Sequence, residues 1–158
     1  MTPRLSRFQL STYTYFQICV RGNNGQNIFT SEKDFLRYLS LIEKYANRYS
    51  LQCFTFCLMD NHAHMLFRAP STQILSKAMH AIQVAYAMYF NRKYHRRGHL
   101  FQDRFSSWVI KDEHHLFETK EYIENNPVKA GMVTQKEDYA WSSAFRDGSC
   151  VTLSPITC

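Results

Sequence analysis

Two histidines, His62 and His64, are the residues of this 158-residue chain whose types and spacing point most directly to chemistry. They flank Ala63 and stand between two apolar runs, Leu58–Met59 and Met65–Phe67. Because successive side chains of a strand point to opposite faces, both imidazoles are expected to project from one face of a sheet. Two neighbouring imidazoles supply half of a typical metal site, although paired surface histidines on a half-exposed strand give the same pattern.

A second pair of side chains, Tyr122 and Asn126, lies in a segment with helical features. Residues at i and i+4 emerge on one face of a helix about one turn apart. We expect this helix to span 112–126, because Pro127 disfavours helical geometry in the residue before it. Asn126 then stands at the helix end, where its amide oxygen can reach outward. Taken alone, Tyr122 is one of ten tyrosines and is explained as well by core packing.

Four strands and three helices are expected to position these side chains. Runs of apolar, aromatic and β-branched residues predict strands at 13–20, 51–59, 62–68 and 105–110. Apolar residues at helical spacing predict helices that begin at Ser31 and at 70–72, besides the helix at 112–126. The composition of 21–25 is typical of a loop. This order predicts an α+β, ferredoxin-like fold: an antiparallel sheet with helices on one face, and a further C-terminal helix that carries Tyr122.

One domain is expected to account for the chain, spanning 1–146, with 147–158 as a loose tail of little periodicity. A chain of this length can bury about two-thirds of its unfolded surface. The 45% hydrophobic and 15% aromatic content indicates a globular rather than a disordered protein. No apolar stretch approaches the roughly 20 residues that cross a bilayer, and the N-terminal arginines are not followed by the apolar run of a signal peptide.

The net charge of the chain indicates its class of binding partner, and its cysteines indicate its cellular compartment. The chain has 19 Lys and Arg against 13 Asp and Glu, a net charge of +6. Such an excess favours a polyanionic partner, nucleic acid first. Five irregularly spaced cysteines do not form a disulfide framework, and Cys53-x-x-x-Cys57 is a poor zinc signature. We therefore expect a cytoplasmic protein without a membrane partner.

The sequence around these residues resembles a known family. His62-Ala63-His64 is similar to the histidine–hydrophobic–histidine motif of the HUH single-strand endonucleases, and the wider sequence resembles their single-tyrosine transposases, in particular the REP-associated tyrosine transposases. Asp103 stands where the family usually has glycine, and Ala63 is smaller than the usual residue. Six blocks carry the resemblance in the family's order, across about residues 13 to 146: Arg21–Asn24, Leu58–His64, Tyr89–Arg92, Gly98–Phe105, Tyr122–Gly131 and Trp141–Ser143.

This resemblance implies a site and a reaction. In the family, the tyrosine that precedes an asparagine–proline segment is the nucleophile, which corresponds to Tyr122. Two histidines and a polar residue one turn after the tyrosine hold a divalent cation, which corresponds to His62, His64 and Asn126. The expected catalytic residues are therefore Tyr122, His62 and His64. The family's substrates are single-stranded DNAs, often with a hairpin formed by a repeated extragenic palindrome, and cleavage gives a 5′-phosphotyrosine intermediate and a free 3′-hydroxyl.

These residue types suit that reaction. Phosphate oxygens repel a nucleophile, so a cation is needed to bind them and to offset the developing charge. Two neutral imidazoles and a neutral amide leave the full charge of the cation for the phosphate, and three protein ligands leave positions open for substrate. A phenol, with an ordinary pKa of about 10, is a poor nucleophile until a base or a metal assists its deprotonation. We expect Mg²⁺ or Mn²⁺, of which Mn²⁺ accepts imidazole ligands more readily.

Basic side chains are candidates for contact with DNA. The run Arg92–Arg97 near the end of the second helix can follow a phosphate backbone, with Tyr94 or His95 stacking on bases. Positive charge at the C-terminus of a helix is also favourable without any ligand, so a solvated helix end is the alternative. The candidate DNA-binding residues are Arg21, Asn23, Arg92, Lys93, Arg96, Arg97 and Arg104.

Three functions are compatible with these features. The leading one is a metal-dependent endonuclease and strand transferase that acts on single-stranded DNA with a hairpin. A transposase relative that binds a DNA hairpin without cutting it can retain the same residues. An RNA-binding ferredoxin-like domain can use aromatic side chains exposed on its sheet, but it leaves the histidine, asparagine and tyrosine set unexplained. Both a homodimer and a monomer are compatible with the sequence.

Overall fold

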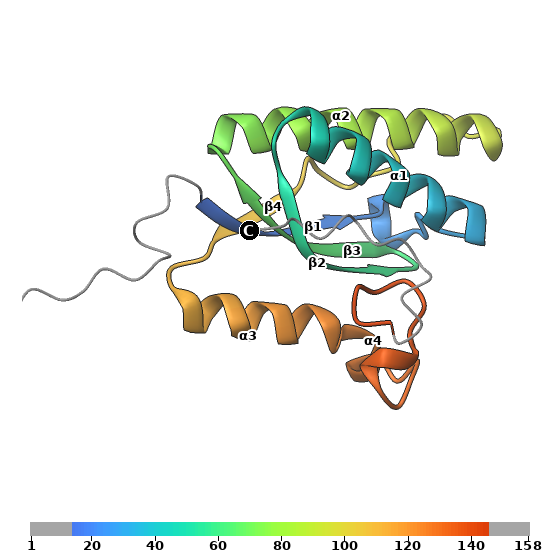
Figure 1. Cartoon of the computed structure of the whole chain (residues 1–158). Helices are drawn as coiled ribbons and strands as arrows, with labels where there is room; N and C mark the ends of the chain where they lie inside the picture. The colour runs from blue at the N-terminus through green and yellow to red at the C-terminus, as the bar shows by residue number, and fades with distance from the viewer. Residues whose placement is uncertain (1–13, 146–158) are drawn as a thin grey trace, which may run out of the picture.

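Four antiparallel strands form one sheet in the order β2-β3-β1-β4 in the computed structural model, which describes residues 14–145. The fold is the predicted ferredoxin-like arrangement (Figure 1). The strands span Thr14–Arg21 (β1), Gln52–Met59 (β2), His62–Ala69 (β3) and Ser106–Val109 (β4). The helices span Glu32–Arg48 (α1), Thr72–Lys93 (α2), Glu113–Glu124 (α3) and Asn126–Lys129 (α4), with short 3₁₀ turns at Asn23–Gly25 and Lys136–Asp138.

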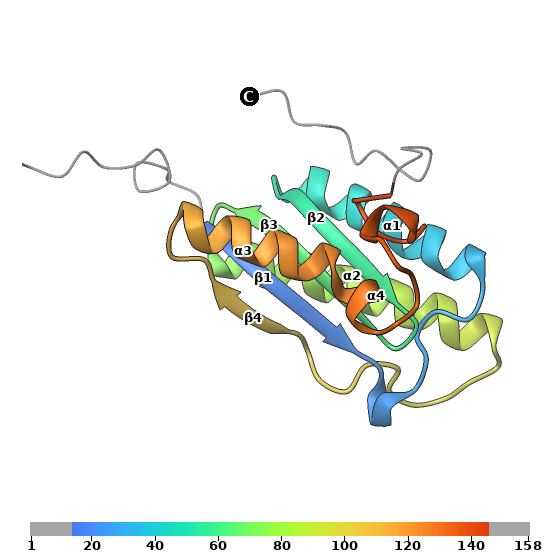
Figure 2. The same ribbon diagram turned by 90° about the horizontal axis from the view of Figure 1, so that it is seen from below.

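Helices cover both faces of the sheet. Figures 1 and 2 show α1 and α2 together on one face, and α3 with α4 on the other. The larger core lies against α1 and α2 and includes Ile18, Met65 and Phe67 from the strands. A smaller core lies beneath α3 and includes Leu66 and Ile123. The predicted layer of two helices and the additional C-terminal helix are therefore confirmed.

The alternation of β1 decides which side chains meet α3. Ile18 and Val20 are buried in the larger core. Because neighbouring residues of a strand point to opposite faces, Gln17, Cys19 and Arg21 project toward the α3 side. This face is the one on which a site can form between the sheet and α3.

Two local predictions are wrong. Arg21 is not part of the expected loop but is the last residue of β1, so its direction follows the strand. The expected helix at 112–126 divides, because α3 ends at Glu124 and Asn126 begins α4. Pro127 lies in the first turn of α4, where the missing N–H costs no hydrogen bond, so this proline starts a helix instead of ending one. The expected tail at 147–158 lies outside the described residues. None of the helices within residues 14–145 is long and apolar enough to span a membrane.

The segment around Trp141 covers the free edge of β2. Leu58 N donates to Trp141 O at 2.8 Å, and Ser143 N donates to Phe56 O at 3.0 Å. The Trp141 indole stacks on Phe35 of α1 with ring centroids 4.5 Å apart. Covering an edge strand in this way protects it from pairing with other chains, so this block of the sequence has a structural role.

Asp34, which is fully buried, joins the start of α1 to the end of α2. Its carboxylate accepts hydrogen bonds from Tyr89 Oη at 2.9 Å, Tyr94 Oη at 2.6 Å and Thr30 N at 3.0 Å, and Lys93 Nζ lies 2.8 Å away. Burial raises the pKa of Asp34, but the hydrogen bonds from Lys93, Tyr94, Thr30 and Tyr89 outweigh it and hold the pKa well below its usual range. Lys93 is therefore engaged by the protein itself.

We expect Asp34→Asn to lower the free energy of unfolding by about 2–4 kcal/mol at pH 7, because it removes one partner of a buried ion pair. Urea denaturation measures this change. The pKa of Asp34 is lower in the folded than in the unfolded chain, so its stabilisation is complete above about pH 4 and is lost as the pH falls further. The difference in the free energy of unfolding between wild type and Asp34→Asn should therefore become smaller as the pH falls below about 4. Glu43→Gln, at an exposed position of α1, is the control, and an Asp34→Asn protein of wild-type stability would contradict the prediction.

Candidate active site

His62 and His64 lie side by side on the face of the sheet that α3 covers. His62, the first residue of β3, pairs with Arg21 of β1, and His64 pairs with Cys19. The two ring centroids are 5.0 Å apart and the ring planes are nearly perpendicular, at 84°. His64 is buried, whereas His62 is partly buried. The prediction that both imidazoles project from one face is confirmed.

A close backbone approach fixes the position of His62. The turn before β3 is tied to the end of β1, because Gly22 N donates to Asn61 O at 2.9 Å. There is no room for a side chain at Gly22, where a Cβ atom would lie 2.0 Å from Gln26 O. The glycine therefore lets the loop after β1 close onto the turn that begins β3.

Both histidines are held in the neutral form. His62 Nδ1 lies 2.7 Å from the acceptor Asn61 Oδ1, so Nδ1 carries the proton and the lone pair of Nε2 is available to a cation. Burial and the charge of Arg21 lower the pKa of His62, against the opposing hydrogen bond with the Asn126 side chain. Burial, His62 and Arg21 lower the pKa of His64 to about 4. Within the described residues His64 Nδ1 is buried without a hydrogen-bond partner, and neutral imidazole is the form that binds metals.

Asn126 completes a set of three neutral donors. Asn126 lies close enough to His62 for its side chain to act on the imidazole and raise its pKa, so the helix break at Asn125 does not take Asn126 away from the histidines. Among residues 14–145, no group of three His, Cys, Asp or Glu side chains is arranged to hold a metal. A metal site here would therefore need an amide as its third protein ligand. Amide oxygens are hard donors of the kind that Mg²⁺ and Mn²⁺ accept.

Tyr122 projects from α3 toward this histidine pair. Its ring centroid lies 5.8 Å from that of His64, with the planes at 78°. Although its neighbour Ile123 is buried in the core beneath α3, Tyr122 is 44% exposed. Lys129 Nζ lies 5.3 Å from the centre of the Tyr122 ring. The alternative in which Tyr122 only fills a core therefore does not describe its surroundings.

Buried polar contacts fix the orientation of α3. Glu124 is buried two residues after Tyr122 and pairs with Lys120 at 2.8 Å and Lys136 at 3.0 Å. Its carboxylate also accepts a hydrogen bond from Thr55 Oγ1 of β2 at 3.1 Å. Burial raises the pKa of Glu124, but the two lysines outweigh it and the pKa is lowered. These contacts hold α3 against β2 in the rotation that directs Tyr122 at His64.

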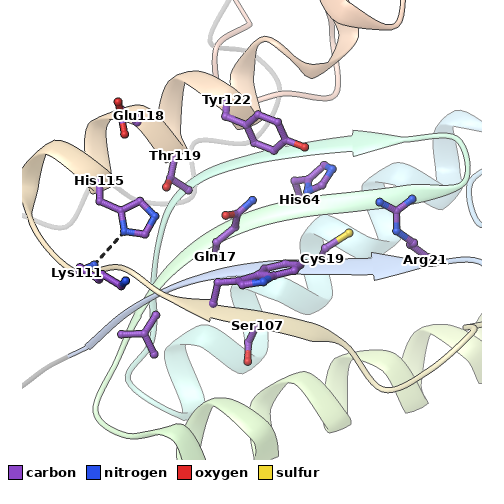
Figure 3. Close-up of a pocket in the computed structure, with 12 residues that line it drawn as sticks. Gln17, Cys19, Arg21, His64, Ser107, Lys111, His115, Glu118, Thr119 and Tyr122 are labelled. Carbon is purple, nitrogen blue, oxygen red and sulfur yellow. Dashed lines mark hydrogen bonds between the residues drawn. The ribbon is translucent and has the colours of Figure 1, made fainter.

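A cleft of about 960 Å³ opens between α3 and the strands β1 and β4. Figure 3 shows Tyr122 above His64 within this cleft, with Arg21 at the end of β1. Arg21 and Lys111 bring positive charge to the lining, and Glu118 brings the opposite charge. The lining residues are Gln17, Cys19, Arg21, His64, Ser107, Trp108, Val109, Lys111, His115, Glu118, Thr119 and Tyr122.

The residues of this site lie within a region that is shared with known proteins. Residues 11–126, most of the chain, match the family model of the IS200-like transposases. The chain belongs to the IS200-like transposase family. The matched region contains His62, His64 and Tyr122 and ends at Asn126.

Solved and curated transposases resemble this IS200-like transposase. A Haemophilus influenzae protein assigned as a REP-associated tyrosine transposase is 27% identical over 124 residues, which cover 70% of this chain and 68% of the relative. A solved REP-associated tyrosine transposase, bound to a REP hairpin, matches with a TM-score of 0.68 at 20% identity, over 100% of this chain and 94% of that one. A transposase structure from Deinococcus radiodurans matches with a TM-score of 0.51 at 17% identity, over 77% and 96%. Both structures share the fold of this chain.

The candidate DNA-binding residues of this transposase fall into three groups. Arg21 lies within the site, where its charge lowers the pKa of both histidines. Lys93 and Arg96 are engaged by the protein: Lys93 pairs with Asp34, and Arg96 donates to Gln26 Oε1 at 2.6 Å. The remaining candidates are exposed: Asn23, Arg92, Arg97 and Arg104.

The C-terminal end of α2, which carries Arg92 and is followed by Arg97, is on the opposite face of the sheet from α3. It lies at the same end of the molecule as the turn between β2 and β3 (Figures 1 and 2). A single strand of DNA that leaves the candidate active site would therefore have to pass around this end of the sheet to reach these arginines. Their contact with DNA stays a prediction.

The structure also brings to the site residues that were not predicted there. Gln17 and Trp108 pair across β1 and β4 and line the cleft. Asn61 holds the His62 ring through Nδ1. The period-two alternation of β1 could have identified Gln17 from its spacing to Arg21, whereas Trp108 requires the register between β1 and β4.

Proposed function

We propose that this transposase is a metal-dependent endonuclease and strand transferase for single-stranded DNA, with Tyr122 as its nucleophile. The observation that carries the proposal is the meeting of three separate segments at one place. The first residues of β3 supply His62 and His64, α3 supplies Tyr122, and α4 supplies Asn126. Together they offer a nucleophile beside neutral metal ligands, which phosphodiester cleavage through a tyrosine requires.

Tyr122 is placed to form and release a covalent bond to DNA. Its phenolate oxygen attacks the scissile phosphorus, and the bond from phosphorus to the 3′ oxygen breaks. The phenol proton passes to solvent, and the departing oxygen takes up a proton to become a 3′-hydroxyl. Because one phosphodiester replaces another, attack by a 3′-hydroxyl on the phosphotyrosine rejoins the strand. Lys129 places a positive charge beside the ring on which negative charge develops.

His62, His64 and Asn126 would hold a divalent cation. The donor set fits this role because both imidazoles are neutral and His62 Nε2 keeps its lone pair. Asn61 supports the His62 ring from the far nitrogen, as partners of metal-ligating histidines commonly do. When bound, Mg²⁺ or Mn²⁺ supplies charge stabilisation to the phosphate oxygens.

The proposed substrate is single-stranded DNA that contains a hairpin, such as a repeated extragenic palindrome. The similarity to REP-associated tyrosine transposases, one of them solved with a REP hairpin, supports this choice. The net charge of +6 also favours a nucleic acid. The basic residues Arg21 and Lys111, which line the cleft beside Tyr122, suit a phosphate backbone.

A covalent-adduct assay tests this function. Labelled single-stranded hairpins from the repeats of the encoding genome are incubated with Mg²⁺ or Mn²⁺ and separated on a denaturing gel. A metal-dependent protein–DNA adduct that disappears in Tyr122→Phe supports the proposal. Tight hairpin binding without an adduct in either metal would establish the non-catalytic hairpin-binding function instead.

We expect Mn²⁺ binding to resist mild acid, because the pKa of His64 is about 4 and that of His62 is lowered too. Protons compete with the metal only below the pKa, so affinity should fall by clearly less than the roughly tenfold expected of two ordinary histidines between pH 7 and 6, and should fall further as the pH approaches 4. Calorimetric titration with Mn²⁺ measures this profile. Two histidines with ordinary pKa values would lose about tenfold over the same step, and that result would contradict the prediction.

A further inference from the structure

Trp108 is a large apolar side chain that lies open in the cleft. It is 51% exposed on β4, an edge strand whose four residues are all exposed. The other tryptophan of the chain, Trp141, is partly buried and stacks on Phe35, a residue of the larger core. Within the described residues, no ring contact or hydrogen bond occupies the Trp108 indole. Its flat face is therefore available to a ligand.

Trp108 stands beside a free amide and a short distance from the histidine pair. It pairs directly with Gln17 of β1, so both side chains project from the same face. Gln17 is two residues from Cys19, which pairs with His64, and two residues of a strand span about 7 Å. The Gln17 amide makes no hydrogen bond within residues 14–145. A flat surface and an unused donor–acceptor pair thus lie next to the candidate reaction centre.

The charge of the cleft indicates what would fill it. Two cations line the cleft: Arg21 at the end of β1, and Lys111 shortly after β4. Glu118 supplies the one carboxylate among the lining residues. Lys111 N donates to His115 Nδ1 at 3.1 Å, so the His115 ring has its Nε2–H free to donate. Cationic groups around an exposed indole fit an anionic chain that carries flat rings, which is the chemistry of single-stranded nucleic acid.

We propose that Trp108 and Gln17 form a nucleobase site that holds the nucleotide next to the scissile phosphate, and that Gln17 reads the identity of its base. This inference rests on the proposed function for the reaction at Tyr122. The base stacks on the Trp108 indole, while the Gln17 amide donates one hydrogen bond and accepts another. Among the bases, adenine is the usual partner of a glutamine amide, which contacts its N6 and N7 together, so we expect the site to favour adenine.

Tryptophan fluorescence tests the site without any need for cleavage. The protein carries Tyr122→Phe, and the probes are unstructured oligo(dA), oligo(dC) and oligo(dT) of about eight nucleotides. We expect oligo(dA) to quench the fluorescence, and the quenching to disappear in Trp108→Phe because the remaining Trp141 is partly buried, stacks on Phe35 and does not line the cleft. Fluorescence anisotropy of labelled oligo(dA) should show a loss of affinity of about 10- to 100-fold for Trp108→Ala. Trp108→Phe should retain most of the affinity, since a smaller ring still stacks.

Two further variants separate a base site from general effects on the protein. Phe117 is 62% exposed on α3 and does not line the cleft, so Phe117→Ala should bind oligo(dA) like the parent protein. Gln17→Glu replaces the donor by an acceptor, and glutamate accepts from the cytosine amino group. This variant should shift the preference from oligo(dA) toward oligo(dC), by about tenfold in the ratio of the affinities.

The outcomes distinguish this inference from the proposed function. Unchanged oligo(dA) affinity in Trp108→Ala overturns the base site, even if hairpins are cleaved at Tyr122. Quenching that depends on Trp108 in a protein that forms no adduct supports the base site and removes the proposed function alone. A change of sedimentation in Trp108→Ala, from dimer to monomer without loss of oligo(dA) affinity, would assign Trp108 to contact between two copies and overturn the inference. An unaltered base preference in Gln17→Glu overturns the reading of the base.

Discussion

Tyr122→Phe is expected to abolish the covalent protein–DNA adduct and to lower the rate of strand cleavage by at least about 10³-fold, while hairpin affinity stays within about twofold of wild type. Phenylalanine keeps the ring that packs at 5.8 Å from His64 but lacks the oxygen that attacks phosphorus. The loss therefore falls on the chemical step and not on the fold. Adduct formation on a denaturing gel and hairpin binding by anisotropy measure the two properties separately.

A matched variant shows whether the effect is specific to Tyr122 or follows from the loss of any tyrosine hydroxyl. Tyr45 is partly buried on α1, on the opposite face of the sheet from α3, so Tyr45→Phe should form the adduct at the wild-type rate. If Tyr122→Phe still cleaves the labelled DNA, another nucleophile must act, such as water or a different side chain. That outcome would contradict the role proposed for Tyr122, although it would leave the metal ligands untouched.

The local pattern of the sequence predicted the fold well because each strand and helix is specified by its own residues. Alternation in 62–68 placed His62 and His64 on one face, and the structure confirms that they are neighbours at 5.0 Å. Helix starts at Ser31 and Ser71 were readable from their capping residues. The antiparallel sheet with its two-helix layer followed from the order of these elements.

Other features depended on contacts between distant segments and could not be read locally. Lys93 belongs to a basic run typical of a DNA-binding surface, but it pairs with Asp34, which lies 59 residues earlier. Trp108 reaches the cleft because β4 pairs with β1 in a register that no local pattern specifies. Pro127 carried a local signal with two meanings, the end of one helix or the start of the next, and the structure shows the second.

The arrangement of α3 bears on the alternative functions. An RNA-binding sheet of the predicted kind stacks bases over an open face, whereas α3 covers the part of this face that carries His64 and Cys57 and leaves its edge at Trp108 exposed. Glu124 secures this helix through Thr55 and Lys136. A protein that only bound hairpins would not require a half-exposed tyrosine to be directed at two neutral histidines. These contacts favour the catalytic proposal over the RNA-binding alternative, and the adduct assay separates it from hairpin binding without cleavage.

His64→Ala is expected to lower Mn²⁺ affinity by more than about 100-fold and to remove the adduct, because it deletes one of the three proposed ligands. The substitution should leave the fold intact, since His64 Nδ1 has no hydrogen-bond partner to lose within the described residues. Calorimetric titration with Mn²⁺ and the adduct assay give the two readouts. His80→Ala is the control, because His80 is exposed on α2, on the opposite face of the sheet from α3, and does not line the cleft.

The same variant tests whether the site is formed within one chain. Tyr122 faces His64 of its own chain, so a mixture of His64→Ala and Tyr122→Phe proteins should remain without activity at any ratio. Activity restored by mixing would mean that α3 is exchanged between two copies, since only an exchanged pair combines an intact tyrosine with intact histidines. An adduct that forms undiminished in His64→Ala, or in wild type with the divalent metal chelated, would show that cleavage does not depend on these ligands.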